Sequence, residues 1–125
     1  MNEANLKERT KQFALRIMRL VDALPSSAAG RAIGNQIIRS GTSVGANYRA
    51  ACRGRSKAEF IAKLGVVVEE ADECCFWLEL IIDGELLAKE KVETLLVEAN
   101  ELTAIFVSSI KTTKSNQKSA IKNEK

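Results

Sequence analysis

Positive charge is concentrated in one stretch of this sequence, and arginine is its main carrier. Between Ala23 and Ala58 there is no acidic residue, while six residues are basic. The guanidinium group of arginine binds phosphate through paired hydrogen bonds, so this stretch is suited to contact a polyanion such as RNA or DNA. The candidate nucleic-acid contacts are Arg39, Arg49, Arg53, Arg55 and Lys57.

The stretch that follows has the opposite charge. From Glu59 to Glu85 eight residues are acidic, and only Lys63 is basic. Two interpretations of the arginines are therefore open. They contact a polyanion, or they pair with these carboxylates inside the protein or between its subunits.

The residues that commonly carry catalysis or hold metals are missing or poorly placed. Histidine does not occur, which removes the commonest general base and most zinc and haem ligation. Glu69 and Glu73 lie one helical turn apart, but carboxylate-bridged metal pairs in bundles also use histidine. The glycines match neither of the common phosphate-binding loop motifs. We expect no enzyme activity, no cofactor and no metal site.

The three cysteines, Cys52, Cys74 and Cys75, form an odd-numbered set without CxxC spacing. We interpret them as small core residues in a reducing cytoplasm, with a redox role as the alternative. The polar first residues lack the character of a secretory signal, and no apolar run is long enough to span a bilayer. These features favour a cytoplasmic protein that does not associate with membranes.

Apolar residues recur at helical spacing in four segments, which predicts an all-α protein. The first segment ends where Pro25 follows Leu24, and Ser26 or Ser27 is placed to cap the second. The third begins at a capping-box pattern, in which Ser56 caps the helix and Glu59 reaches back to the cap N–H.

The connections between these segments are short, and short connections favour antiparallel neighbours. We therefore predict an up-down antiparallel four-helix bundle that forms a single domain over residues 1–113. Residues 114–125 are polar with an excess of lysine. We expect them to form a flexible basic tail.

The second segment is unusually rich in small residues. Glycine is unfavourable in a helix, so several glycines in one helix imply a close approach to a neighbouring backbone. The Ser40–Ser43 stretch is a possible kink or break. A buried amide needs hydrogen-bond partners, so Asn47 either contacts RNA or bonds to a neighbouring helix or subunit. The candidate packing and interface residues are Gly41, Ser43, Gly45 and Asn47.

Several motifs in this order and spacing resemble one protein family. The series Arg39–Arg49 is followed by Cys52–Phe60, with Leu24–Pro25 before it and the acidic stretch Glu69–Glu73 after it. Over roughly residues 6–110, the chain resembles the bacterial four-helix-bundle family of 23S rRNA intervening-sequence proteins. It departs from the common pattern at Ala50, where many members carry Glu, and at Gly45, where many carry Pro.

The resemblance implies a small bundle that assembles into a ring, commonly a homopentamer, without catalytic residues. A related branch is the accessory variability protein of diversity-generating retroelements, which resembles an adaptor between reverse transcriptase and nucleic acid. We therefore expect a non-enzymatic oligomer that binds the backbone of RNA or DNA, such as ribosomal RNA, through its basic surface. The alternative is a protein-protein adaptor or scaffold, whose charged faces serve ring assembly and a protein partner such as a reverse transcriptase.

Overall fold

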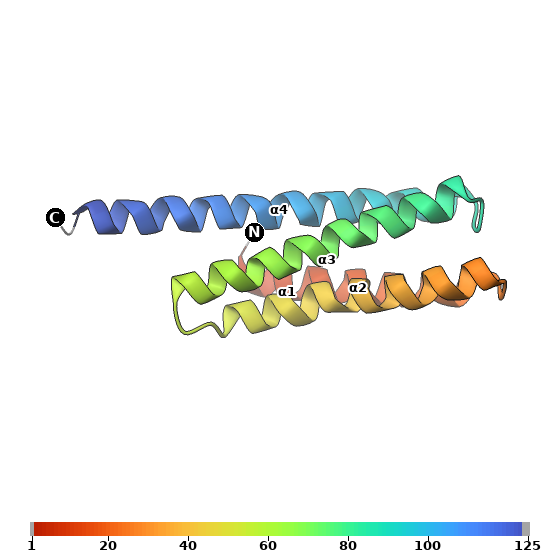
Figure 1. Cartoon of the computed structure of the whole chain (residues 1–125), viewed down its shortest axis with the longest axis horizontal. Helices are drawn as coiled ribbons and strands as arrows, with labels where there is room; N and C mark the ends of the chain where they lie inside the picture. Colours follow the sequence, from red (N-terminus) through yellow and green to blue (C-terminus); the bar gives the residue numbers. More distant parts are fainter. Residues whose placement is uncertain (1, 124–125) are drawn as a thin grey trace.

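Four helices make up the structure, a computed structural model that describes the backbone of residues 2–123 and the side chains of residues 2–120. The helices are α1 (Glu3–Ala23), α2 (Ala28–Cys52), α3 (Lys57–Asp83) and α4 (Lys89–Asn123). They run alternately up and down, with the α2–α3 turn at one end and the other two turns at the opposite end (Figure 1). The predicted all-α, up-down four-helix bundle is confirmed.

Each helix packs against the helices before and after it in the sequence, and α1 also meets α4. The seam between α1 and α4 is the least closely packed of the four. The shared core includes fully buried side chains from every helix, such as Phe13, Ile37, Leu64 and Phe106. Burial of these side chains is the main force that holds the helices together.

Side-chain caps fix where the helices begin, largely as the sequence predicts. Ser27 Oγ accepts a hydrogen bond from Gly30 N at 3.1 Å, and Ser56 Oγ accepts one from Glu59 N at 3.1 Å. The second half of the predicted capping box is different. The carboxylate of Glu59 accepts from Arg55 N at 3.3 Å, one residue before the predicted donor.

The glycines of α2 allow it to lie close against α1. A Cβ added at Gly41 would lie 2.8 Å from Ile17 Cγ1, and one at Gly45 would lie 3.2 Å from Thr10 Oγ1. The possible kink at Ser40–Ser43 does not occur, because α2 is continuous from Ala28 to Cys52. The hydroxyls in this stretch donate to carbonyls one turn earlier in the same helix, which leaves its hydrogen-bond ladder in place.

The last helix extends past residue 113, the predicted end of the bundle domain. Helix α4 continues through Asn123 and projects beyond the α2–α3 turn (Figure 1). Residues 114–123 contain neither glycine nor proline, so a helix that is already formed propagates through them at little cost. The predicted tail is therefore helical as far as Asn123, while residues 124 and 125 lie outside the described part of the chain.

Candidate nucleic-acid interface

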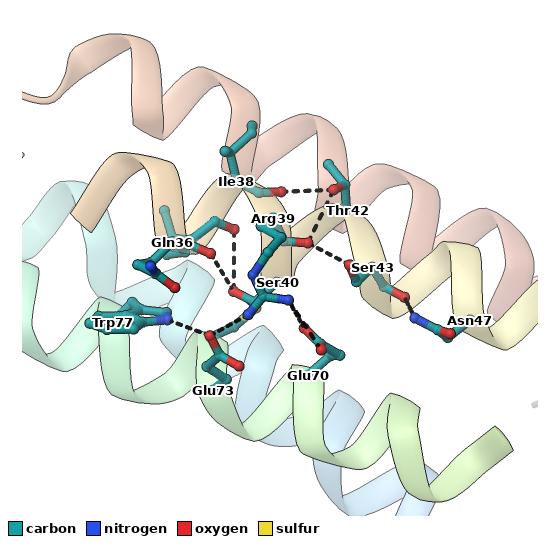
Figure 2. Close-up of polar contacts among 12 residues, drawn as sticks. Gln36, Ile38, Arg39, Ser40, Thr42, Ser43, Asn47, Glu70, Glu73 and Trp77 are labelled. Atoms are coloured by element: carbon teal, nitrogen blue, oxygen red, sulfur yellow. Dashed lines mark hydrogen bonds and ion pairs between the residues drawn. The ribbon is translucent and has the colours of Figure 1, made fainter. Parts of the chain in front are cut away.

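Arg39 is bound by acidic residues of α3. Its Nη2 lies 2.6 Å from Glu73 Oε1, and its Nη1 lies 3.3 Å from Glu70 Oε2. Trp77 Nε1 donates a second hydrogen bond to Glu73 Oε1 at 3.1 Å (Figure 2). The hydrogen bonds that the guanidinium donates to Glu73 and Glu70 raise its pKa. Of the two interpretations open from the sequence, pairing within the bundle therefore holds for Arg39.

Arg49 lies in different surroundings, on the side of α2 that faces α1. It is exposed, and no carboxylate among the described residues pairs with it. Together with Lys7 and Lys11 it lines a groove of about 300 Å³ between the two helices. The remaining lining residues are uncharged: Thr10, Gly45 and Ala46. We call these six residues the α1–α2 basic groove.

The two lysines of this groove were missed in the sequence analysis, which weighed only the continuous basic stretch. In α1 the basic residues alternate with Glu3 and Glu8, so no charged block stands out. The contact between Gly45 and Thr10 places Lys7 and Lys11 opposite the turn of α2 that carries Arg49. The small residues of α2 could have indicated these lysines, because small residues predict the close approach of a neighbouring helix.

The two lysines differ in their surroundings. Lys7 Nζ lies 3.3 Å from Glu3 Oε2, one turn earlier in α1, and the side chains are 36% and 60% exposed. Such a pair is weak in water, so it can exchange for a stronger anion. No ion pair is present at Lys11 within residues 2–120. The groove therefore holds at least two cations whose charge is not balanced locally.

Three further candidates lie at the turn between α2 and α3. Arg53, Arg55 and Lys57 are exposed, and none forms an ion pair with the side chains that the structure describes. Arg55 and Lys57 line a hollow of about 420 Å³ that also includes Glu3 and reaches α4. Like Arg49, these three cations therefore have no acidic partner among the described residues.

The candidate interface residues contact their own chain. Gly41 and Gly45 pack against α1, as a close helix approach requires. Ser43 Oγ donates to Arg39 O at 2.6 Å, and Asn47 Nδ2 donates to Ser43 O at 2.9 Å. One N–H of the Asn47 amide thus bonds within α2, because Ser43 O lies one turn earlier on the same side. A contact of Asn47 with RNA or another subunit stays a prediction.

Tyr48 and the cysteines belong to the core. Tyr48 is 5% exposed, and its ring centroid lies 5.2 Å from that of Phe106. Burial raises the pKa of Cys74 to about 12, and burial also raises the pKa of Cys52 and Cys75. The thiols are therefore protonated at neutral pH and are poor nucleophiles.

The outer side of α3 is acidic and carries exposed apolar side chains. Val66 is 38% exposed and Phe76 is 53% exposed, and the Phe76 ring stands edge-on to Trp77 with centroids 5.2 Å apart. Exposed aromatic residues of this kind are typical of protein-protein contacts. The neighbouring carboxylates, which include Glu69 and Asp72, make this side unsuitable for nucleic acid.

The described residues contain neither a metal-binding cluster nor a membrane-spanning helix. Over this part of the chain, no group of three or more Cys, Asp or Glu side chains is placed to hold a metal ion. No helix in the described part combines the length and apolar character that crossing a membrane requires.

The comparisons with known proteins agree with the fold. A family model for the 23S rRNA-intervening sequence protein matches residues 2–108. A crystal structure of a protein with unknown function, from the S23 ribosomal protein family of Bacteroides thetaiotaomicron, is 38% identical with a TM-score of 0.79. The match covers 84% of this chain and 97% of that chain. No curated protein matches. The chain belongs to the 23S rRNA-intervening sequence protein family.

Proposed function

We propose that this protein is a non-enzymatic bundle that binds the backbone of RNA or DNA through the α1–α2 basic groove. The observation that carries the proposal is the convergence of Lys7, Lys11 and Arg49 from two helices on a groove with no acidic lining residue. A phosphate bound there meets three cations at once. Release of the counterions that surround nucleic acid would supply most of the affinity.

Further cations follow Arg49 towards the α2–α3 turn. Arg53 lies one helical turn after Arg49, and Arg55 and Lys57 follow at the turn. These charges extend the track over which successive phosphates are contacted. Arg39 does not contribute, because two carboxylates already bind its guanidinium. We attribute recognition to the backbone rather than the bases, since the cations of the groove match phosphate and one N–H of Asn47 is bound within its own helix.

Assembly into an oligomer would place several copies of the α1–α2 basic groove on one particle. The family resemblance supports a homopentameric ring, in which several grooves act on one polyanion and gain avidity. The ligand we propose places the protein in the bacterial cytoplasm.

A second candidate function is that of a protein-protein adaptor, and the acidic outer side of α3 favours it. Exposed Val66 and Phe76 among carboxylates fit a partner with a basic and apolar surface, such as another copy of this chain or a reverse transcriptase. We expect Phe76→Ser to weaken assembly or partner binding, which light scattering would detect. An unchanged mass and unchanged partner binding would count against this function.

The test of nucleic-acid binding is a salt titration of the intact protein with single-stranded RNA and duplex DNA. The triple variant Lys7→Gln, Lys11→Gln, Arg49→Gln should lose at least tenfold in affinity at about 0.1 M salt. Its slope of log affinity against log salt should fall by about two for single strands.

A matched variant removes three exposed cations outside the groove: Lys63→Gln, Lys89→Gln and Lys111→Gln. Its net charge equals that of the triple variant, so it separates a local site from general attraction. Equal losses in both variants would overturn the groove as the binding site. No binding by the unmodified protein at low salt would overturn the function itself. Light scattering on each variant checks that assembly is unchanged.

A further inference from the structure

The loosely packed seam between α1 and α4 opens into a hollow at the end of the bundle opposite the α2–α3 turn. We call it the α1–α4 hollow, and its volume is about 290 Å³. It lies beside the last turns of α1 and the first turns of α4, on the right in Figure 1. The α1–α2 basic groove is formed by other residues, so the two sites are separate.

The charged side chains that line this hollow are all basic. They are Arg16 and Arg19 of α1 and Lys91 of α4. Arg16 Nη2 donates to the uncharged hydroxyl of Thr94 at 3.3 Å. No carboxylate pairs with any of the three within the described part of the chain. Further along the same seam, Arg9 Nη2 lies 2.6 Å from Glu98 Oε1. Arg9 thus has an acidic partner from α4, whereas the cations of the hollow have none.

The wall of the hollow is apolar. Leu20 is 7% exposed, Leu95 is 4% exposed, and Leu87 is half-buried, and all three line the hollow together with Ala23. Water against such a wall is displaced favourably by an apolar ligand. A site between the helices of a bundle, with an apolar wall and a few convergent polar groups, is the usual form of a small-molecule site.

These two properties define the class of ligand. The cations without an acidic partner favour a ligand with an anionic group. The apolar wall favours an apolar chain beside that group. A bare phosphate or a nucleic-acid backbone would leave the exposed apolar part of the wall, at Ala23 and Leu87, in contact with water. We propose that the α1–α4 hollow binds a small carboxylate that carries an apolar chain, such as a medium-chain fatty acid. The modest volume suits a short chain better than a long membrane lipid.

The test is a titration of the full-length ¹⁵N-labelled protein with octanoate, followed by the shifts of its backbone amides. We expect saturable shifts concentrated in the last turns of α1 and the first turns of α4. Two added methylenes, hexanoate to octanoate, should tighten binding roughly three- to tenfold. Acetate tests the charge alone and should not bind. Octylamine tests the chain with the wrong charge and should bind at least about fivefold more weakly.

Two double variants test the residues. Arg19→Gln with Lys91→Gln should weaken octanoate binding several-fold and should remove the preference over octylamine. Lys89→Gln with Lys111→Gln has the same net charge and should bind octanoate as the unmodified protein does. Shifts that map elsewhere, equal binding of octylamine, or an unchanged affinity in the first variant would each overturn the proposal. RNA binding by these variants is a separate readout, so the outcome here does not depend on the proposed function.

Discussion

Because α1 and α2 lie close together, we predict that replacing glycine by alanine has opposite effects at Gly41 of α2 and at Gly65 of α3. Gly41→Ala places a methyl group 2.8 Å from both γ carbons of Ile17, a side chain that is fully buried and cannot move aside. Overpacking of this kind costs about 1–3 kcal/mol, while the better helix propensity of alanine returns about 0.5–1 kcal/mol. We expect a net loss of about 1 kcal/mol in the free energy of unfolding.

Gly65→Ala is the matched control. Gly65 lies within α3, and a Cβ there meets nothing within 4 Å. Only the gain in helix propensity remains, so we expect this variant to be more stable by up to about 1 kcal/mol. The same substitution therefore changes stability in opposite directions at the two sites, and the difference is about 2 kcal/mol. Urea unfolding followed by circular dichroism, at one fixed protein concentration, measures both values.

The Ile17→Ala background isolates the contact. This substitution removes both γ carbons and costs about 2–5 kcal/mol by itself. In that background Gly41→Ala should become neutral or stabilising, because the added methyl group enters the space that Ile17 leaves. If Gly41→Ala stabilises the unmodified protein as much as Gly65→Ala does, then α1 and α2 are not packed as described. An unchanged cost in the Ile17→Ala background would refute the assignment to Ile17.

Three further predictions concern the charged and thiol groups. Arg49→Gln should weaken RNA binding several-fold in fluorescence anisotropy, whereas Arg39→Gln should change it less than about twofold because Arg39 is already paired; the reverse order would refute the assignment of the groove. Burial raises the pKa of Cys74 from 9.0 to about 12, so the unfolded thiol ionises first and stability falls as pH rises from about 9 towards 12. Cys74→Ala should flatten that decline in urea titrations, by up to about 1.4 kcal/mol per pH unit, and an unflattened slope would argue against a buried neutral thiol. Glu98→Gln removes the paired hydrogen bonds of 2.6 and 2.7 Å from Arg9 and should cost about 1 kcal/mol in the same assay, since both side chains are partly exposed; no loss would show that the pair is fully screened.

Local signals predicted most of the fold. Pro25 ends the first helix region, and Ser27 and Ser56 cap the next two helices, because each acts on backbone groups within a few residues of itself. The length of α4 was not predicted from such local signals. Composition predicted a flexible tail after residue 113, but polar residues without glycine or proline allow an existing helix to continue.

The candidate site was predicted less completely, because it depends on which residues meet across helices. Asn47 was expected to contact RNA or to bond to a neighbouring helix or subunit, and the bond from its amide to Ser43 O one turn away was not foreseen. Lys7 and Lys11 were overlooked, because they belong to a different segment from the basic stretch. Both outcomes depend on side-chain positions and helix pairing, which composition and spacing do not specify.

Arg39 and Arg49 show most clearly what the sequence determined and what the tertiary structure decided. The sequence alone determined that both lie on a basic helix rich in small residues, and that an acidic helix follows it. The tertiary structure decided their different surroundings. Arg39 faces α3 and meets Glu70 and Glu73, while Arg49 faces α1 and meets two lysines. The physical reason is that a helix in a bundle has a different neighbour on each side, and the charge of that neighbour decides whether an arginine is neutralised or remains able to bind an anion.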